Sequence, residues 1–324
     1  MQHFFIRQLL PLGLLCLLFY SPLHAQKIET PVFNTDTTRR DSLAKRWHFN
    51  GGIGLDASAI SLLNPRVGEG DGRLSAGLQL NAMLNYEGRK YLWNNRAILQ
   101  LSVLKESDAD WTKGADALLW NSQIGRRLVG KWFIALMADI QTQTLPTYDG
   151  RFLSPQTDSS RVSARCFAPA TLKLAPGLLW KPNQRFNLLL SAVSNKNVIV
   201  SDPVLAAQQT ESGATLFGNK PGKMWTGQVG AELRADLNLK FANNKVAFLS
   251  VLDLYSNYLK TPENISVEWL SSLDLLLSKH LALSLRSDWY YDDAVLVKVG
   301  GRPDRLGKRV SIRNTFFVKY NKVF

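Results

Sequence analysis

The sequence predicts an all-β protein, a transmembrane antiparallel up-and-down β-barrel with twelve strands. Apolar and polar residues alternate along most of the chain, and a period of two is typical of strands whose two faces differ. Twelve such segments occur, and outer-membrane barrels of bacteria usually have an even number of strands. The connections between the segments are alternately short and long, as they are in those barrels.

The first 25 residues are predicted to be a cleavable signal peptide. Arg7 precedes an apolar stretch, Leu9–Tyr20, and a small residue, Ala25, follows where a signal peptidase would cut. The apolar stretch is too short to span a bilayer core of about 30 Å as a helix. We therefore expect export, cleavage near Ala25 and an outer-membrane location. Residues 26–46 are rich in Thr, Asp, Lys and Arg and are expected to form a disordered periplasmic leader, which leaves 47–324 for the barrel.

The clearest strand is predicted for Trp225–Phe241. Its odd positions are all apolar or small, and its even positions are all polar or glycine. Seventeen residues at about 3.3 Å each exceed the usual globular strand of 5 or 6 residues. The same alternation runs through eleven other segments: 47–55, 74–86, 91–103, 118–128, 132–140, 172–180, 186–190, 248–254, 265–277, 281–291 and 310–320.

Short turns are predicted at 88–90, 129–131, 181–184, 242–245 and 279–280, and long connections at 62–71, 105–114, 144–166, 198–223, 258–264 and 293–308. Strands 47–61 and 309–324 are expected to pair and close the barrel. Both chain termini are then expected on the short-turn side, which would be periplasmic. The longest uninterrupted apolar run after the signal is Trp132–Ala138, so no transmembrane helix is expected.

Aromatic residues gather at the strand ends beside the short turns, which predicts a girdle at a membrane–water interface. They are Tyr86, Tyr91, Trp93, Trp132, Trp180, Phe186, Phe241 and Tyr320. The final segment carries Phe316, Val318, Tyr320 and the terminal Phe324. This pattern is similar to the signal by which outer-membrane barrels are handed to their assembly machinery, and Lys322 departs from its usual apolar residue.

Six stretches carry a further pattern: 167–170, 177–182, 254–258, 262–265, 267–269 and 289–293. Together they resemble a family of exported outer-membrane barrels of unknown function from Gram-negative bacteria. That family usually has an Asn-Trp pair after its first strand, and Leu62–Pro65 lacks the Trp. The resemblance implies a fold and a location, and it implies no activity and no catalytic residues.

The polar phase of each strand is expected to face the lumen, where its charges need partners. The main candidates for a lumen charge network are Asp56, Arg96, Asp139, Lys173, Glu232, Arg234, Asp236, Asp253, Asp274, Arg286, Asp288 and Arg313. Twelve strands give a barrel of roughly 24 Å between backbone walls. Side chains from both walls would leave a narrow aqueous path or none, so a small pore and a closed barrel both remain open.

The net charge of +13 has two interpretations. Basic residues at the short turns are either ordinary soluble turn residues or contacts for anionic headgroups. They are Arg89, Lys90, Arg126, Lys131, Lys181, Arg185, Lys245, Lys279 and Lys322. Membrane lipids are therefore expected partners. Nucleic-acid binding is not expected of an exported barrel.

The composition predicts no cofactor, no metal site and no enzyme. After the signal peptide only Cys166, His48 and His280 remain, too few for a zinc site or Cys/His catalysis. The alternatives are a barrel that docks a partner through its loops or leader and, less favoured, a lipid hydrolase with Ser, His and Asn on its lipid-facing surface. Whether the acidic cluster Asp288, Asp292 and Asp293 binds a cation is left open.

Overall fold

The computed structural model describes residues 47–65, 73–105, 111–148, 154–155, 161–208, 219, 222–259, 261–293, 295–302 and 305–323. The expected signal peptide, the expected leader and Phe324 lie outside these residues. Within them, no helix is long and apolar enough to cross a membrane.

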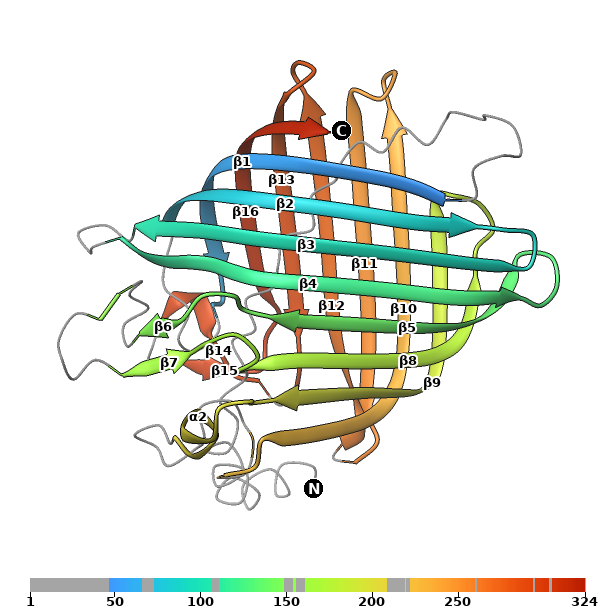
Figure 1. Ribbon diagram of the computed structural model, residues 1–324. Coiled ribbons are helices and arrows are strands. Elements are labelled where there is room, and N and C mark those ends of the chain that lie inside the picture. Colours follow the sequence, from blue (N-terminus) through green and yellow to red (C-terminus); the bar gives the residue numbers. More distant parts are fainter. Residues whose placement is uncertain are drawn as a thin grey trace, which may run out of the picture.

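Twelve strands of the described chain form one closed antiparallel barrel, which confirms the predicted fold (Figure 1). They are β1 (Trp47–Leu63), β2 (Arg73–Glu87), β3 (Tyr91–Lys105), β4 (Thr112–Arg127), β5 (Trp132–Thr142), β8 (Ala170–Trp180), β9 (Phe186–Ile199), β10 (Trp225–Phe241), β11 (Val246–Asn257), β12 (Thr261–Leu276), β13 (Leu281–Tyr291) and β16 (Ser311–Val323). Each strand pairs with the next barrel strand along the chain, and β1 pairs with β16. In projection β2–β5 cross β10–β13 of the opposite wall, as tilted strands of a barrel do.

The barrel has two different rims. The short-turn rim carries the turns 88–90, 128–131, 181–185, 242–245 and 277–280, toward the top and right of Figure 1. The long-loop rim carries small elements that the sequence did not predict: β6 (Thr147–Tyr148) with β7 (Val162–Ala164), the helix α2 (Pro203–Ala207), and β14 (Val297–Lys298) and β15 (Leu306–Gly307) with a 3-10 turn, Val299–Gly301, between them.

One long connection is shorter than predicted. The sequence placed a loop at 258–264, but β12 already begins at Thr261. After a register shift at Ser256 and Asn257, the pairing between β11 and β12 continues from Ile265 to Thr261. A β-bulge therefore takes up the irregular residues that broke the alternation in the sequence.

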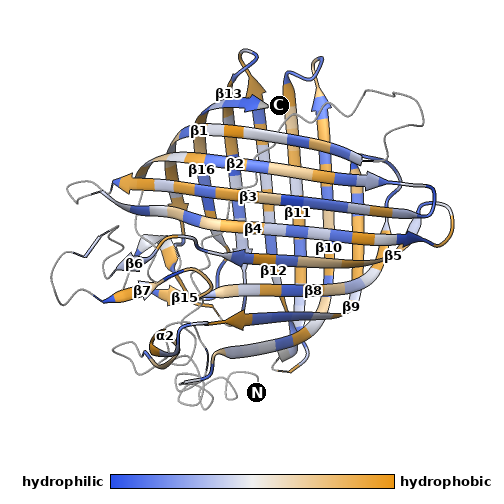
Figure 2. Ribbon diagram, viewed as in Figure 1, coloured by the Kyte–Doolittle hydropathy of each residue, from blue (hydrophilic) through white to orange (hydrophobic). Residues whose placement is uncertain are grey.

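The outer surface of the barrel is apolar. Large apolar side chains of the predicted lipid-facing phase point outward, and Phe49, Leu55, Ile134 and Leu285 are each more than half exposed. Hydropathy alternates in bands along the strands (Figure 2). Such a surface is unfavourable in water and is stabilised by lipid. Trp132 and Trp180 stack with ring centroids 6.0 Å apart, and Trp47 and Tyr86 lie 5.1 Å apart. Both pairs lie at the short-turn rim; Trp132, Trp180 and Tyr86 belong to the predicted girdle, and Trp47 was not predicted as part of it.

Apolar and polar side chains are both buried on the inward phase of the strands. Near the short-turn rim, seven buried apolar residues of β3, β5, β8 and β9 form one cluster: Leu92, Phe133, Ala135, Met137, Ala175, Leu179 and Leu189. Polar residues elsewhere on the inward phase are equally well covered, because Thr315, Ser194 and Ser284 are at most 1% exposed. Part of the inward phase is thus an apolar core, which the sequence had predicted as polar lumen.

Candidate functional site

Lys173 is the centre of the most connected charge group in the lumen. Its Nζ donates to Glu232 Oε1 at 2.6 Å and to Asp253 Oδ2 at 2.9 Å. These residues lie on β8, β10 and β11. The Glu232 side chain is fully buried, and Ser194 Oγ donates to its second oxygen at 2.7 Å. A register shift between β9 and β10, next to Glu232, brings Ser194 into place.

A second set of charges adjoins this group. Arg234 Nε donates to Asp236 Oδ1 at 3.3 Å, and Arg234 Nη1 lies 4.0 Å from Asp139 Oδ2. Asn121 Nδ2 donates to the other oxygen of Asp139 at 2.5 Å. Arg96, five strands away in the barrel order, is attracted electrostatically by Asp236 and repelled by Arg234. These contacts tie opposite parts of the barrel wall together.

The strand register explains why these residues meet. Arg96 lies opposite Asn121, Asn121 opposite Asp139 and Asp139 opposite Lys173, so one row crosses β3, β4, β5 and β8. Cross-strand partners of this kind lie about 5 Å apart. Alternation alone predicts whether a side chain points to the lumen or to the lipid. The strand register determines which side chains are neighbours.

Another charge group occupies the remaining wall, on β13 and β16. Arg286 donates to Asp288 through Nε at 3.1 Å and through Nη2 at 2.9 Å. Arg313 Nη2 donates to the same carboxylate at 3.1 Å. Arg286 and Asp288 are 2% and 6% exposed, so this carboxylate is the buried counter-charge of two guanidinium groups.

Lys319 continues the charged surface toward the short-turn rim. Its Nζ lies 3.6 Å from Asp274 Oδ1, donates to Ser284 Oγ at 2.9 Å and sits 4.5 Å from the centre of the Phe317 ring. Asp56 of β1 lies opposite Lys319 in the register and interacts with it electrostatically. Ten of the twelve candidate residues thus form an ion pair with another charged residue, and Asp56 and Arg96 interact electrostatically with charged residues nearby.

The sequence analysis missed a buried clasp at the long-loop rim. Lys113 Nζ donates to the Leu145 carbonyl and to Thr147 Oγ1, each at 2.7 Å, and forms an ion pair with Asp116. Asp116 accepts from the backbone of Thr144 and of Leu145, each at 2.8 Å. The clasp therefore fixes the chain that leads from β5 into the β6–β7 hairpin. The pair lies at a register shift in β4, where the alternation that guided the sequence analysis fails.

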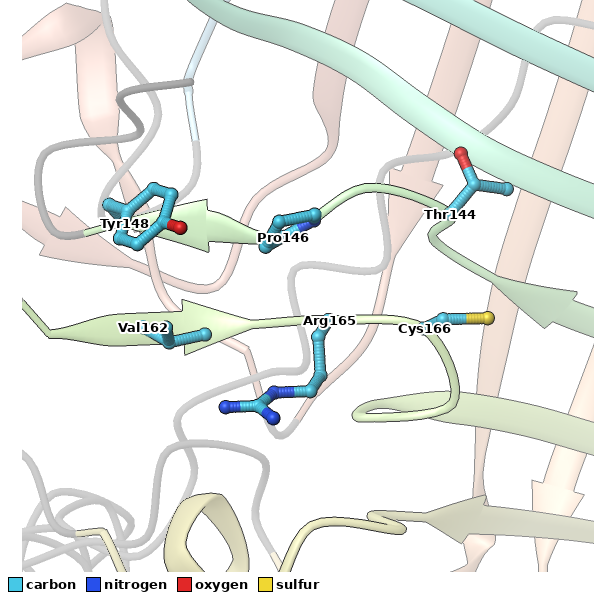
Figure 3. Close-up of a pocket in the computed structure, with 6 residues that line it drawn as sticks. All are labelled: Thr144, Pro146, Tyr148, Val162, Arg165 and Cys166. Atoms are coloured by element: carbon cyan, nitrogen blue, oxygen red, sulfur yellow. The ribbon is translucent and has the colours of Figure 1, made fainter. Parts of the chain in front are cut away.

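The β6–β7 hairpin borders an open pocket of about 420 Å³. It is lined by Thr144, Pro146, Tyr148, Val162, Arg165 and Cys166, as Figure 3 shows. Arg165 Nε is 3.1 Å from Asp202 Oδ2, and Asp202 also caps the first turn of α2. The pocket therefore lies within an ordered part of the long-loop rim.

The lipid-facing surface holds a Ser–Asn pair with no histidine beside it. Ser287 Oγ donates to Asn314 Oδ1 at 2.8 Å, and Trp289 Nε1 donates to Ser287. His280 lies in the turn before Leu281, seven residues from Ser287 and so about 23 Å away along the strand. A Ser–His pair needs hydrogen-bond contact, which this separation prevents.

The acidic residues at the end of β13 have separate partners. Asp288 binds two arginines inside the lumen, whereas Asp293 accepts from Tyr291 Oη at 2.5 Å and lies 4.0 Å from Lys308 Nζ. Among the described residues, no group of three His, Cys, Asp or Glu side chains is arranged to hold a metal ion.

The fold defines the class of this protein: a transmembrane antiparallel β-barrel of the outer-membrane type. Residues 61–148 match a family described as "Protein of unknown function (DUF3078)", so the resemblance to a family of unknown function is confirmed. The match includes the Leu62–Pro65 stretch.

The chain is also similar to solved barrels. The translocator domain of the autotransporter NalP from Neisseria meningitidis is 8% identical, with a TM-score of 0.41 over 86% of this chain and 90% of that chain. An outer-membrane channel from Pseudomonas putida F1 is 9% identical, with a TM-score of 0.41 over 88% and 99%. The porin NanC is 10% identical, with a TM-score of 0.37 over 82% and 98%. No curated protein matches the chain in sequence.

Proposed function

We propose that this chain is an outer-membrane barrel whose lumen is closed by paired charges, and that it serves as an anchored docking platform. The observation that carries the proposal is the burial of the lumen charges. Glu232 is 3% exposed and is held by Lys173 and Ser194. In a wide aqueous pore, a glutamate in the middle of a strand would be hydrated.

The apolar cluster supports a closed lumen independently of the charges. Phe133, Met137 and Leu179 project inward near the short-turn rim and are at most 3% exposed. A solute entering from the long-loop rim would meet the charge network and then this cluster, which lies on β3, β5, β8 and β9. Side chains of two different chemistries therefore narrow the path for diffusion.

A closed barrel leaves the long-loop rim as the surface on which a partner can dock. The Lys113–Asp116 clasp, the β6–β7 hairpin and the Arg165–Asp202 ion pair give this rim fixed structure. Ordered loops lose less conformational entropy on binding than flexible ones. The same proposal includes two steps of biogenesis. The signal peptide at 1–25 directs export and is cleaved, and the barrel assembly machinery recognises the C-terminal residues Phe316, Val318, Tyr320 and Phe324.

We expect the refolded barrel, residues 26–324, to show no steady conductance in a planar bilayer at neutral pH. Pairs of opposite charge and packed apolar side chains leave no continuous water path for ions. The side chains of Arg234 and Asp236 are 25% and 32% exposed, which identifies where water enters the network. Single-channel recording is the measurement, with a known porin refolded in the same way as the positive control. Regular unit steps of current through the unsubstituted barrel would show that it is a pore instead.

We expect Cys166 to react with a membrane-impermeant maleimide on intact cells. Cys166 is an exposed free thiol on the long-loop rim. In a Cys166→Ser background, Asn183→Cys places a thiol in an exposed turn of the short-turn rim and should react only after the cells are opened. The reverse pattern of labelling would invert the proposed orientation.

A further inference from the structure

The short-turn rim is strongly basic. All nine basic residues that the sequence placed at short turns lie on this rim, and Glu87 is the one acid in its described turns and adjoining strand ends. The turn between β4 and β5 and the turn between β8 and β9 are neighbours, because Lys181 N donates to the Lys131 carbonyl at 2.9 Å.

An aromatic pair lies directly below these two lysines. Trp132 and Trp180 are register partners on β5 and β8, and their rings stack at 6.0 Å. The next outward pair in the same register is Ile134 and Leu178, which are 54% and 44% exposed. From the rim inward, β5 and β8 therefore carry a lysine in each adjoining turn, and then two indoles and two aliphatic side chains on their outer face. We call these six residues the β5–β8 strip.

The charges of the strip are available to a ligand. Neither Lys131 nor Lys181 has an ion pair with any carboxylate in the described parts of the chain. Arg126, at the end of β4, is exposed nearby and lies opposite Ile134 in the register. Cations held close together without counter-ions attract a multivalent or concentrated negative charge.

We propose that the β5–β8 strip binds an anionic glycerophospholipid of the leaflet at the short-turn rim. The phosphate lies between Lys131 and Lys181, the glycerol lies over Trp132 and Trp180, and the acyl chains follow Ile134 and Leu178. The sequence of polar, aromatic and aliphatic groups matches the order of a lipid from headgroup to tail. The proposal rests on the barrel spanning a membrane and does not depend on whether its lumen conducts.

The test is native mass spectrometry of the detergent-released barrel titrated with phosphatidylglycerol, with phosphatidylcholine as the zwitterionic comparison. The double variant Lys131→Gln/Lys181→Gln is expected to weaken phosphatidylglycerol binding about 30-fold, since a lysine near a membrane surface contributes about 1 kcal/mol. The matched control, Lys245→Gln/Lys279→Gln, removes two charges from other turns of the same rim and should change binding less than threefold.

A second variant distinguishes binding at the β5–β8 strip from general attraction between a basic rim and anionic lipid. Trp132→Leu keeps both charges and an apolar side chain, and it should reduce the number of lipids retained after collisional activation. Equal losses in the two lysine double variants, or equal retention of phosphatidylcholine and phosphatidylglycerol by the parent protein, would overturn the site. Heat-modified migration on gels shows whether each variant is folded.

Discussion

Replacing Lys173 with Met is expected to lower the free energy of unfolding by about 3–5 kcal/mol, the usual cost of removing one partner from a buried ion pair. Glu232 and Asp253 would both lose their shared cation, and the Glu232 side chain has no access to water in the folded barrel. The loss of unfolding free energy should lie toward the lower end of this range, because the Lys173 side chain is 16% exposed.

Urea unfolding of the barrel in lipid vesicles, followed by tryptophan fluorescence, measures this loss. Lys196→Met is the matched control, since Lys196 lies opposite Lys173 in the register and makes no ion pair within the described residues. The double variant Lys173→Met/Glu232→Gln should recover part of the loss by removing the stranded charge. An equal loss in the Lys196 variant would contradict the assigned role of Lys173.

Asp288→Ala is expected to be about as damaging, at about 3–5 kcal/mol, because two guanidinium groups would remain side by side without their shared carboxylate. Arg286 is 2% exposed and cannot turn toward water without disturbing the wall. Adding Arg313→Met to the variant removes one of the two stranded charges and should restore part of the stability.

Asp293→Ala is the comparison for this second variant. It removes an acid five residues further along, whose lysine partner lies at 4.0 Å and is more than half exposed. Exposed pairs contribute less than about 1 kcal/mol. The same urea titration should therefore separate the two aspartates clearly, and similar midpoints for both variants would show that the Asp288 group is not a buried pair.

The strands could be predicted because lipid and lumen impose opposite preferences on alternate residues. The segment Trp225–Phe241 alternates without a break, and β10 has the same bounds. In contrast, β4 begins at Thr112, six residues before the predicted start at 118. There Lys113 and Asp116 are held by the neighbouring loop, so neither lipid nor lumen determines their polarity.

The lumen was only partly predictable. The polar phase identified which charged residues point inward, but their pairing depends on register shifts and on which walls of the closed barrel approach one another. The apolar cluster did leave a signal. Trp132–Ala138 is apolar at every position, which is typical of a strand buried on both faces, with Phe133 and Met137 inward and Ile134 outward. The short elements of the long-loop rim, two or three residues each in β6, β7, β14 and β15, give no periodicity to detect.

The ion pairs of Lys173 also constrain how the barrel can be assembled. Its two ion-pair partners follow it by 59 and 80 residues, so in a partial sheet that ends before β10 Lys173 lacks both of them and has only Asp139 opposite it in the register. Contacts over such distances in sequence form late, because closing the intervening chain is entropically unfavourable. The charges that stabilise the finished barrel therefore destabilise partly assembled sheets. This favours all-or-none insertion over the accumulation of open sheets.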